Sequence, residues 1–175
     1  PLGSFQPNEG SSGCDWAEPG MYVANTTSPV ESLPCPLGHE CPQTGMIRAL
    51  PCAQGRFANE AGLSECQLCP RGTYQTESGS KECQDCHAVV LGSSTTEIQS
   101  TSPSACVCPA GMYLPLNKSE CLACPSAMTC PAASDMRNLE KAGYDSLSNS
   151  TGPYPQVNVG YMTLSEAPLV VYECL

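Results

Sequence analysis

The chain has 175 residues, a formal net charge of −10 and only seven Lys and Arg residues, which excludes nucleic acid as an expected partner. Leu, Ile, Val and Phe make up only about 16% of the residues, a fraction that is typical of disorder in a highly charged chain. The 14 cysteines oppose disorder, because disulfides can replace a large apolar core. No apolar run is long enough to predict membrane insertion within this segment.

The cysteine content predicts an oxidising compartment, so we expect an extracellular location, either secreted or in the ectodomain of a cell-surface protein. Three sequons agree and predict a glycoprotein with acceptors at Asn25, Asn117 and Asn149. The opening Pro1-Leu-Gly-Ser4 is typical of an expression-tag remnant, so residues 1–4 are set aside and the chain is interpreted as an excised piece of ectodomain.

Residues 5–51 are predicted to form atypical cysteine-rich units after a loose, polar start at 5–13. Cys14 begins a stretch in which Trp16 is expected to pack with its neighbours rather than form a contact patch. The repeat at 52–86, described in the next paragraph, has a spacing of 17 residues. The same spacing holds before it, because Cys35 lies 17 residues before Cys52.

Residues 52–86 contain two consecutive copies of one repeat. A cysteine opens each copy, a glycine follows three residues later, and an aromatic residue stands two residues beyond it. A Glu-Cys pair closes a loop of 13 residues, and the next copy opens three residues after the closing cysteine. So short a repeat cannot bury its own core. We expect a positive φ at the glycine and an aromatic side chain (Phe57, Tyr74) that packs on a disulfide.

The repeat returns after a Ser- and Thr-rich loop at 87–105, as Cys108-Pro-Ala-Gly-Met-Tyr113. The spacing of Cys124 and Cys130 copies that of Cys35 and Cys41. The sequence thus predicts a small disulfide-rich fold, in which residues 52–130 form an elongated array of short, irregular β-ribbon modules with little helix.

Residues 131–175 hold a single cysteine and are expected to differ from the array. A short helix is predicted over 134–143, with a Ser or Asp cap and a Gly stop. Alternating β-branched residues at 157–164 and 168–173 predict a β-hairpin. Its apolar side chains are either core or a candidate partner surface formed by Val157, Val159, Tyr161, Val171 and Tyr172.

The stretch 69–86 has the form Cys-Pro-X-Gly-X-Tyr…Cys-X-X-Cys and resembles the ephrin-receptor-like cysteine-rich repeat, which is related to the tumour-necrosis-factor-receptor module. The segment 83–113 resembles the junction that precedes such a repeat. Arrays followed by a segment like 160–174 are similar to those of very large protist surface proteins. The resemblance implies extracellular receptor or adhesion architecture and names no ligand.

The resemblance also implies which cysteines pair in the centre of the chain. The implied disulfides are Cys52–Cys66, Cys69–Cys83, Cys86–Cys106 and Cys108–Cys121. For the flanks, two arrangements stay open at this point. Either Cys35–Cys41 and Cys124–Cys130 form and leave Cys14 and Cys174 unpaired, or Cys14–Cys35 and Cys130–Cys174 form and leave Cys41 and Cys124.

Metal and catalytic chemistry have little support in the sequence, and no metal, cofactor or catalytic residue is expected. The cysteines at 66, 69, 83 and 86 have a zinc-ribbon spacing, but the further copies of the loop and the sequons favour disulfides. The two histidines, His39 and His87, are interpreted as exposed loop residues. The carboxylates are scattered, so solvated charge is favoured over a calcium site.

We therefore expect an extracellular binding or adhesion module that displays loops on a rigid disulfide-stapled rod and belongs to a larger surface or secreted protein. Its partner would be a protein or glycan, or another copy of the chain. The alternative is a purely structural spacer or filament component. A secreted enzyme or inhibitor fragment is the least favoured hypothesis, because a thin ribbon offers no cleft that excludes water.

Overall fold

The computed structural model describes residues 2–8, 10, 12–24, 31–138, 153–164 and 167–174, and every statement below refers to these residues. The chain divides into two compact parts. The N-terminal part comprises residues 1–84 and 97–102, and the C-terminal part comprises residues 85–96 and 103–175. None of the described helical segments is long and apolar enough to cross a membrane.

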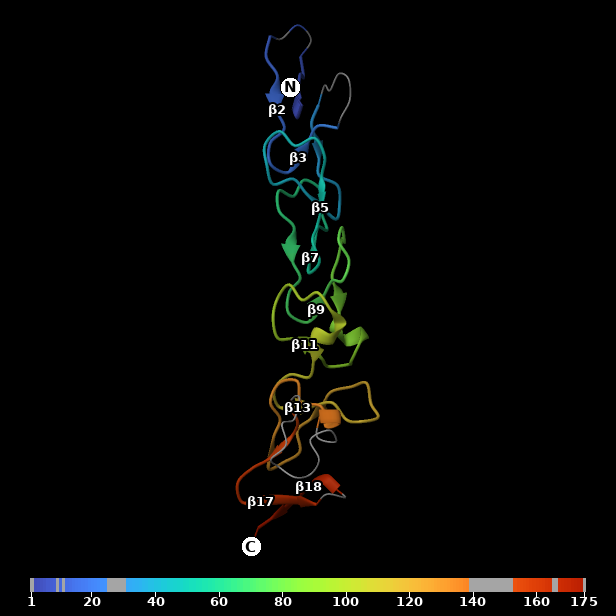
Figure 1. Ribbon diagram of the computed structural model, residues 1–175, viewed down its shortest axis with the longest axis vertical. Coiled ribbons are helices and arrows are strands. Elements are labelled where there is room, and N and C mark those ends of the chain that lie inside the picture. The colour runs from blue at the N-terminus through green and yellow to red at the C-terminus, as the bar shows by residue number, and fades with distance from the viewer. Residues whose placement is uncertain are drawn as a thin grey trace. The chain divides into compact units, whose positions relative to one another are not determined.

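The N-terminal part consists of antiparallel pairs of two-residue strands, which follow one another from β2 to β9 in Figure 1. The pairs are β1 (Ser4–Phe5) with β2 (Asp15–Trp16), β3 (Met21–Tyr22) with β4 (Leu33–Pro34), β5 (His39–Glu40) with β6 (Leu50–Pro51), and β7 (Arg56–Phe57) with β8 (Gln67–Leu68). Strand β9 (Thr73–Tyr74) follows in the same part, and β10 (Gln84–Asp85) lies at the boundary between the two parts.

The C-terminal part contains four more antiparallel pairs, two 3₁₀ turns and one short helical segment at 136–138. The turns are η1 (Cys86–Ala88) and η2 (Pro103–Ala105). The pairs are β11 (Ser94–Thr95) with β12 (Cys106–Val107), β13 (Met112–Tyr113) with β14 (Leu122–Ala123), β15 (Met128–Thr129) with β16 (Gln156–Val157), and β17 (Tyr161–Leu164) with β18 (Ala167–Glu173).

The strands are short because the repeat itself interrupts them. In the first central repeat, β7 begins directly after Gly55, whose φ of 74° is accessible mainly to glycine, and β8 ends directly before Cys69. The amide of Cys69 donates to the carbonyl of Gly55 at 2.9 Å and closes the ribbon. The expected class, a small disulfide-rich fold of irregular β-ribbons with little helix, is confirmed.

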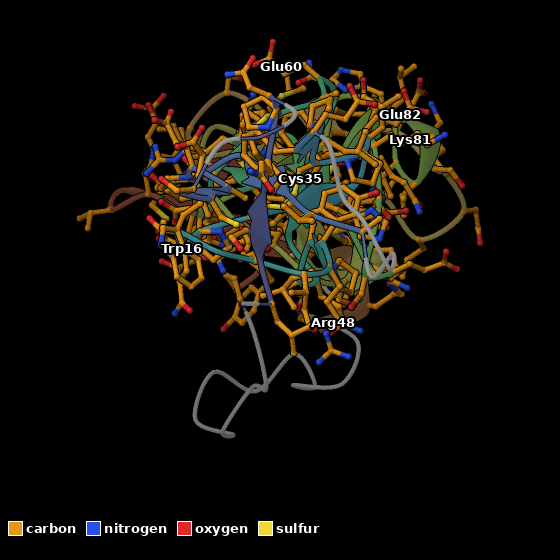
Figure 2. The ribbon with its side chains drawn as sticks, turned by 90° about the horizontal axis from the view of Figure 1, so that it is seen from above. Trp16, Cys35, Arg48, Glu60, Lys81 and Glu82 are labelled. Carbon is orange, nitrogen blue, oxygen red and sulfur yellow. A yellow bond between two sulfur atoms is a disulfide. The ribbon has the colours of Figure 1, made fainter. Side chains whose placement is uncertain are left out.

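Cystines make up most of the buried core. Ten of the 17 buried hydrophobic residues in the described part of the chain are cysteines. Tyr74 and Tyr113 are buried as well, and Tyr113 packs in one cluster with Cys130. In the view from above in Figure 2, the completely buried Cys35 lies in the interior, whereas Glu60 and other labelled charged side chains point outward. Crosslinked sulfur thus occupies the place that large aliphatic side chains fill in an ordinary domain.

The predicted C-terminal hairpin forms, but its first strand is shorter than expected. Val157 belongs to β16 and pairs with Met128 of β15, so the predicted strand over 157–164 is wrong in its first half. The chain turns at Gly160, which has a φ of 88°, and the amide of Tyr161 donates to the carbonyl of Asn158 at 3.2 Å. Only then does β17 begin.

Two further expectations concern the start of the chain and the predicted helix. Ser4, in the segment set aside as a tag remnant, takes part in the fold because it pairs with Trp16 and is buried. At the predicted helix, the carboxylate of Asp135 accepts from the amide of Arg137 at 2.8 Å and residues 136–138 are helical. The rest of that prediction, over 139–143, lies outside the described residues.

Candidate functional site

The structure brings twelve of the fourteen cysteines together in six disulfides. Their Cα–Cα distances lie between 5.3 and 6.1 Å, within the usual range. The pairs are Cys35–Cys41, Cys52–Cys66, Cys69–Cys83, Cys86–Cys106, Cys108–Cys121 and Cys124–Cys130. Cys14 and Cys174 are exposed free thiols, so the alternative pairs Cys14–Cys35 and Cys130–Cys174 do not form.

The disulfide pairing removes the zinc-ribbon alternative on chemical grounds. The cysteines at 66, 69, 83 and 86 belong to three different disulfides, so none of them is a thiolate that could bind zinc. The described residues hold no group of three His, Cys, Asp or Glu side chains that could bind a metal ion.

Successive repeats of the N-terminal part are joined by a recurring pair of backbone hydrogen bonds. The residue that begins a repeat is called its opening residue, and the glycine three residues later is called its turn glycine. In the first bond, the amide of a turn glycine donates to a carbonyl of the following repeat. In the second, the amide of a residue at the loop tip of the following repeat donates to the carbonyl of the opening residue of the preceding repeat. The first bond joins Gly20 to Cys41, Gly38 to Ala58 and Gly55 to Gln75, at 2.8 to 2.9 Å. The second joins Gly45 to Ala17, Gly62 to Cys35, Gly79 to Cys52 and Gln99 to Cys69, at 2.7 to 2.8 Å.

The turn glycines allow the repeats to approach each other this closely. A Cβ atom on Gly38 would lie 2.1 Å from the carbonyl oxygen of Gly79, and one on Gly20 would lie 2.3 Å from the carbonyl oxygen of Gly62. Both glycines also have positive φ angles, of 76° and 88°. The glycine of the repeat therefore serves two purposes, because it makes the turn and also leaves room for the next repeat.

A carboxylate adds a side-chain contact between repeats. Glu40 on β5 accepts a hydrogen bond from the backbone amide of Cys66 at 2.7 Å, across a sequence separation of 26 residues. Arg56 lies near the same cysteine and donates to its carbonyl at 3.1 Å and to the Glu65 carboxylate at 2.9 Å. The backbone amide and the backbone carbonyl of Cys66 therefore each have a side-chain hydrogen-bond partner.

Replacing Glu40 with alanine is expected to lower the free energy of unfolding by about 1–2 kcal/mol, because the partly buried amide of Cys66 loses its acceptor. Glu40→Gln keeps an acceptor oxygen and should lose less. Glu60→Ala, at an exposed carboxylate, is the control and should stay within about 0.5 kcal/mol of the unmodified chain. Denaturant unfolding measures the free energy of unfolding of all three variants. Equal losses for Glu40→Ala and Glu60→Ala would show that the hydrogen bond from Cys66 to Glu40 does not contribute to stability.

The two histidines make contacts within local turns, and His87 is exposed whereas His39 is half-buried. The Nδ1 atom of His39 lies 3.0 Å from the carbonyl of Leu37. The amide of His87 donates to the carboxylate of Asp85 at 2.8 Å, and this bond, with the nearby ring of His87, lowers the pKa of Asp85. Asp85 is the N-terminal cap of the 3₁₀ turn η1, so the contact between Asp85 and His87 has a local structural explanation.

A shallow cavity of about 630 Å³ lies in the C-terminal part, and its charged groups already pair with each other. Val89, Val90 and Leu114 contribute apolar surface, and Asp135 and Arg137 contribute charge. The Nε atom of Arg137 donates to both oxygens of Asp135 at 2.9 and 3.0 Å, and this pairing raises the pKa of Arg137. No charged side chain is left there to hold an ionic ligand.

The five residues of the candidate partner surface differ in exposure. Val159, Tyr161 and Tyr172 are exposed, whereas Val157 and Val171 are half-buried. The exposed Met162 and Val170 were missed. By strand register, Met162 stands opposite Tyr172, so the two side chains share one face, and Val170 lies on that face two residues away. Strand alternation is the signal that could have identified them.

The remaining predicted positions are on the surface or outside the described residues. Asn117 is exposed, as an acceptor for a glycan must be, and Asn25 and Asn149 are not among the described residues. Trp16 is 51% exposed and its ring lies over Gly45, where an added Cβ would be 2.8 Å from the indole. The expected packing of Trp16 is thus only partial.

Comparison with known proteins agrees with this geometry over the central repeats. Residues 55–106 match the family described as tyrosine-protein kinase ephrin type A/B receptor-like. No curated protein matches the chain. The matched segment begins at the turn glycine of the first central repeat and ends at the closing cysteine of the Cys86–Cys106 disulfide. The match and the six disulfides indicate an extracellular, non-catalytic type of cysteine-rich module.

Proposed function

We propose that the chain is a spacing and display segment of a larger extracellular protein, either secreted or on a cell surface. Its disulfide-crosslinked repeats would hold their loops, and the neighbouring segments of the larger protein, at fixed separations. The observation that supports this proposal is the pair of backbone hydrogen bonds between successive repeats, which recurs from Ala17 to Gln99 with nearly constant geometry. Backbone bonds of this kind fix the position of one repeat on the next without depending on particular side chains.

A distance measurement tests this function. In a Cys174→Ser variant, which leaves Cys14 as the one exposed free thiol, one fluorophore is placed on Cys14 and another at Lys81 through an unnatural amino acid, so both labels lie in the N-terminal part. A rigid spacer predicts a narrow distance distribution. Deleting residues 52–68, one complete repeat with its own disulfide, should shift that distribution to shorter distances without broadening it. A broad distribution of the kind given by a flexible linker, before or after the deletion, would contradict the proposal.

A second candidate function, recognition of a protein or glycan partner, is favoured by the exposed apolar side chains of the C-terminal hairpin. Val159 is fully exposed, and Tyr161 and Tyr172 are each at least 40% exposed. Surfaces of this kind often mark interaction sites.

Changing Val159 and Tyr161 to glutamate should abolish adhesion to the partner surface and leave the thermal unfolding midpoint unchanged. Leu116→Glu, at another exposed apolar side chain of the C-terminal part, is the matched surface control. Adhesion is measured to cells and immobilised glycans. Loss of the folded state in the double variant would show that these side chains belong to the core, and unchanged adhesion would exclude them as the binding surface.

A further inference from the structure

We infer that Cys14 and Cys174 are halves of two further disulfides, each shared with a repeat outside this sequence, and that a cysteine stands immediately before Pro1 as the partner of Cys14. The inference goes beyond the proposed function, because it rests on the register of the repeats and holds whether the array spaces, displays or binds.

The opening cysteines of four repeats share one backbone hydrogen bond, which marks the opening position. The amide of the opening cysteine donates to the carbonyl of the preceding turn glycine: Cys35 to Gly20, Cys52 to Gly38, Cys69 to Gly55 and Cys124 to Gly111, all at 2.8 to 2.9 Å. The amide of Ala17 makes the same bond to Gly3 at 3.1 Å. Ala17 is also completely buried, as Cys35, Cys52 and Cys69 are. Ala17 therefore occupies an opening position, and Gly3, with a φ of 83°, occupies the turn position of the repeat before it.

This register makes Cys14 a closing cysteine. It lies three residues before Ala17, just as Cys66 lies three residues before Cys69 and Cys121 three before Cys124. Both of these closing cysteines bond to an opening cysteine that lies three residues before a turn glycine. Three residues before Gly3 is the position that precedes Pro1, and its separation from Cys14 equals the 14 residues of Cys52–Cys66 and Cys69–Cys83.

The local sequence agrees with the register. Pro1-Leu-Gly-Ser-Phe5 has the proline, the turn glycine and the aromatic of the repeat at their expected places. Gly10, with a φ of 80°, stands where Gly62, with a φ of 84°, stands in the first central repeat. The opening segment that was interpreted as a tag remnant is, on this inference, the body of a repeat, and its pairing in β1 follows from that.

The same bond identifies Cys174 as an opening cysteine. Its amide donates to the carbonyl of Gly160 at 2.9 Å, and Gly160 is a turn glycine at the start of β17. Every opening cysteine in the six disulfides bonds to a residue later in the chain, at separations of 6, 13, 14 or 20 residues. The partner of Cys174 therefore follows it.

The repeat that Ala17 opens lacks both of its cysteines, whereas the repeat that Cys35 opens has Ala49 at the corresponding closing position and closes at Cys41 instead. Ala17 replaces an opening cysteine, and the closing position of the same repeat, three residues before Cys35, is Ser32. In the six disulfides every closing cysteine is bonded to an opening cysteine, and a cysteine before Pro1 would give Cys14 the same kind of partner.

Adding one cysteine immediately before Pro1 tests the inference directly. Non-reducing peptide mapping should show a bridge from the added residue to Cys14, the number of alkylatable thiols should fall from two to one, and the melting temperature should rise. Adding serine there, or cysteine followed by a three-glycine spacer, provides the matched controls, in which Cys14 should stay reactive or bridge less completely. Continued full reactivity of Cys14 in the first variant would overturn the inference.

Sequencing the natural transcript gives an independent result that does not depend on folding. A cysteine codon directly before Pro1 and another within about 20 residues after Cys174 are expected, a window set by the known repeat separations. Any other residue before Pro1, or no cysteine in the downstream window, would overturn it. The label-distance experiment depends on neither result, so the proposed function and this inference can fail separately.

Discussion

Replacing both Cys52 and Cys66 with alanine is expected to lower the free energy of unfolding by about 2–5 kcal/mol. The disulfide between them joins residues 14 apart in sequence and is almost completely buried, while Ala58 is the main apolar residue packed with it. Removing the crosslink frees the unfolded chain and leaves a cluster too small to hold the repeat by apolar contacts. Since the alanine side chain is apolar, the loss does not include the cost of burying a hydroxyl group.

Guanidinium unfolding measured by circular dichroism and intrinsic fluorescence tests this expectation, with Cys14→Ala as the control. Cys14 is an exposed free thiol, so its replacement should change the free energy of unfolding by less than about 0.5 kcal/mol. A double variant at 52 and 66 as stable as the control would show that packing, rather than crosslinking, maintains the central repeats.

Gly38→Ala is expected to have the second large effect, a loss of about 3 kcal/mol or more, because two costs add. The φ of 76° is unfavourable for any side chain, and the new Cβ would lie 2.1 Å from the carbonyl oxygen of Gly79. The repeats must separate to relieve this contact, which breaks the backbone bonds between Gly38 and Ala58 and between Gly79 and Cys52.

Gly10→Ala separates the cost of the positive φ from the cost of the steric contact between repeats. Gly10 has a similar φ of 80°, but no atom lies within 4 Å of an added Cβ, so only the conformational cost of about 1–2 kcal/mol is expected there. Thermal and denaturant unfolding of both variants measure the difference. Equal losses at the two glycines would mean that the contact between repeats contributes nothing to stability.

The fold class could be predicted from the sequence because the repeat is periodic and its cysteines are local. The 17-residue step between Cys52 and Cys69 predicted two stapled ribbons, and each disulfide there joins residues only 14 apart. The contacts between repeats could not be predicted in the same way. The approach of Gly38 to Gly79 joins residues 41 apart in sequence, and no local pattern distinguishes a glycine that makes a turn from one that also makes room for a neighbour.

The predicted strand from Val157 onward was wrong in its first half for a physical reason. Alternating β-branched residues predicted one strand from Val157 onward, but alternation does not show where the chain turns, and Gly160 was the overlooked signal. At the other end, Ala17 has no sulfur, so the repeat that it opens was not recognised by counting cysteines. The hydrogen bond from Ala17 to Gly3 and the complete burial of Ala17 indicate that register.

Alkylation of the native chain followed by non-reducing peptide mapping tests the central claim, that crosslinks rather than an apolar core maintain this fold. The structure predicts two reactive thiols, Cys14 and Cys174, six intrachain bridges at the observed positions, and loss of the fold on reduction. A native, folded chain in which most of the 14 cysteines react, or one that is unfolded by a chelator and unaffected by a reductant, would contradict it.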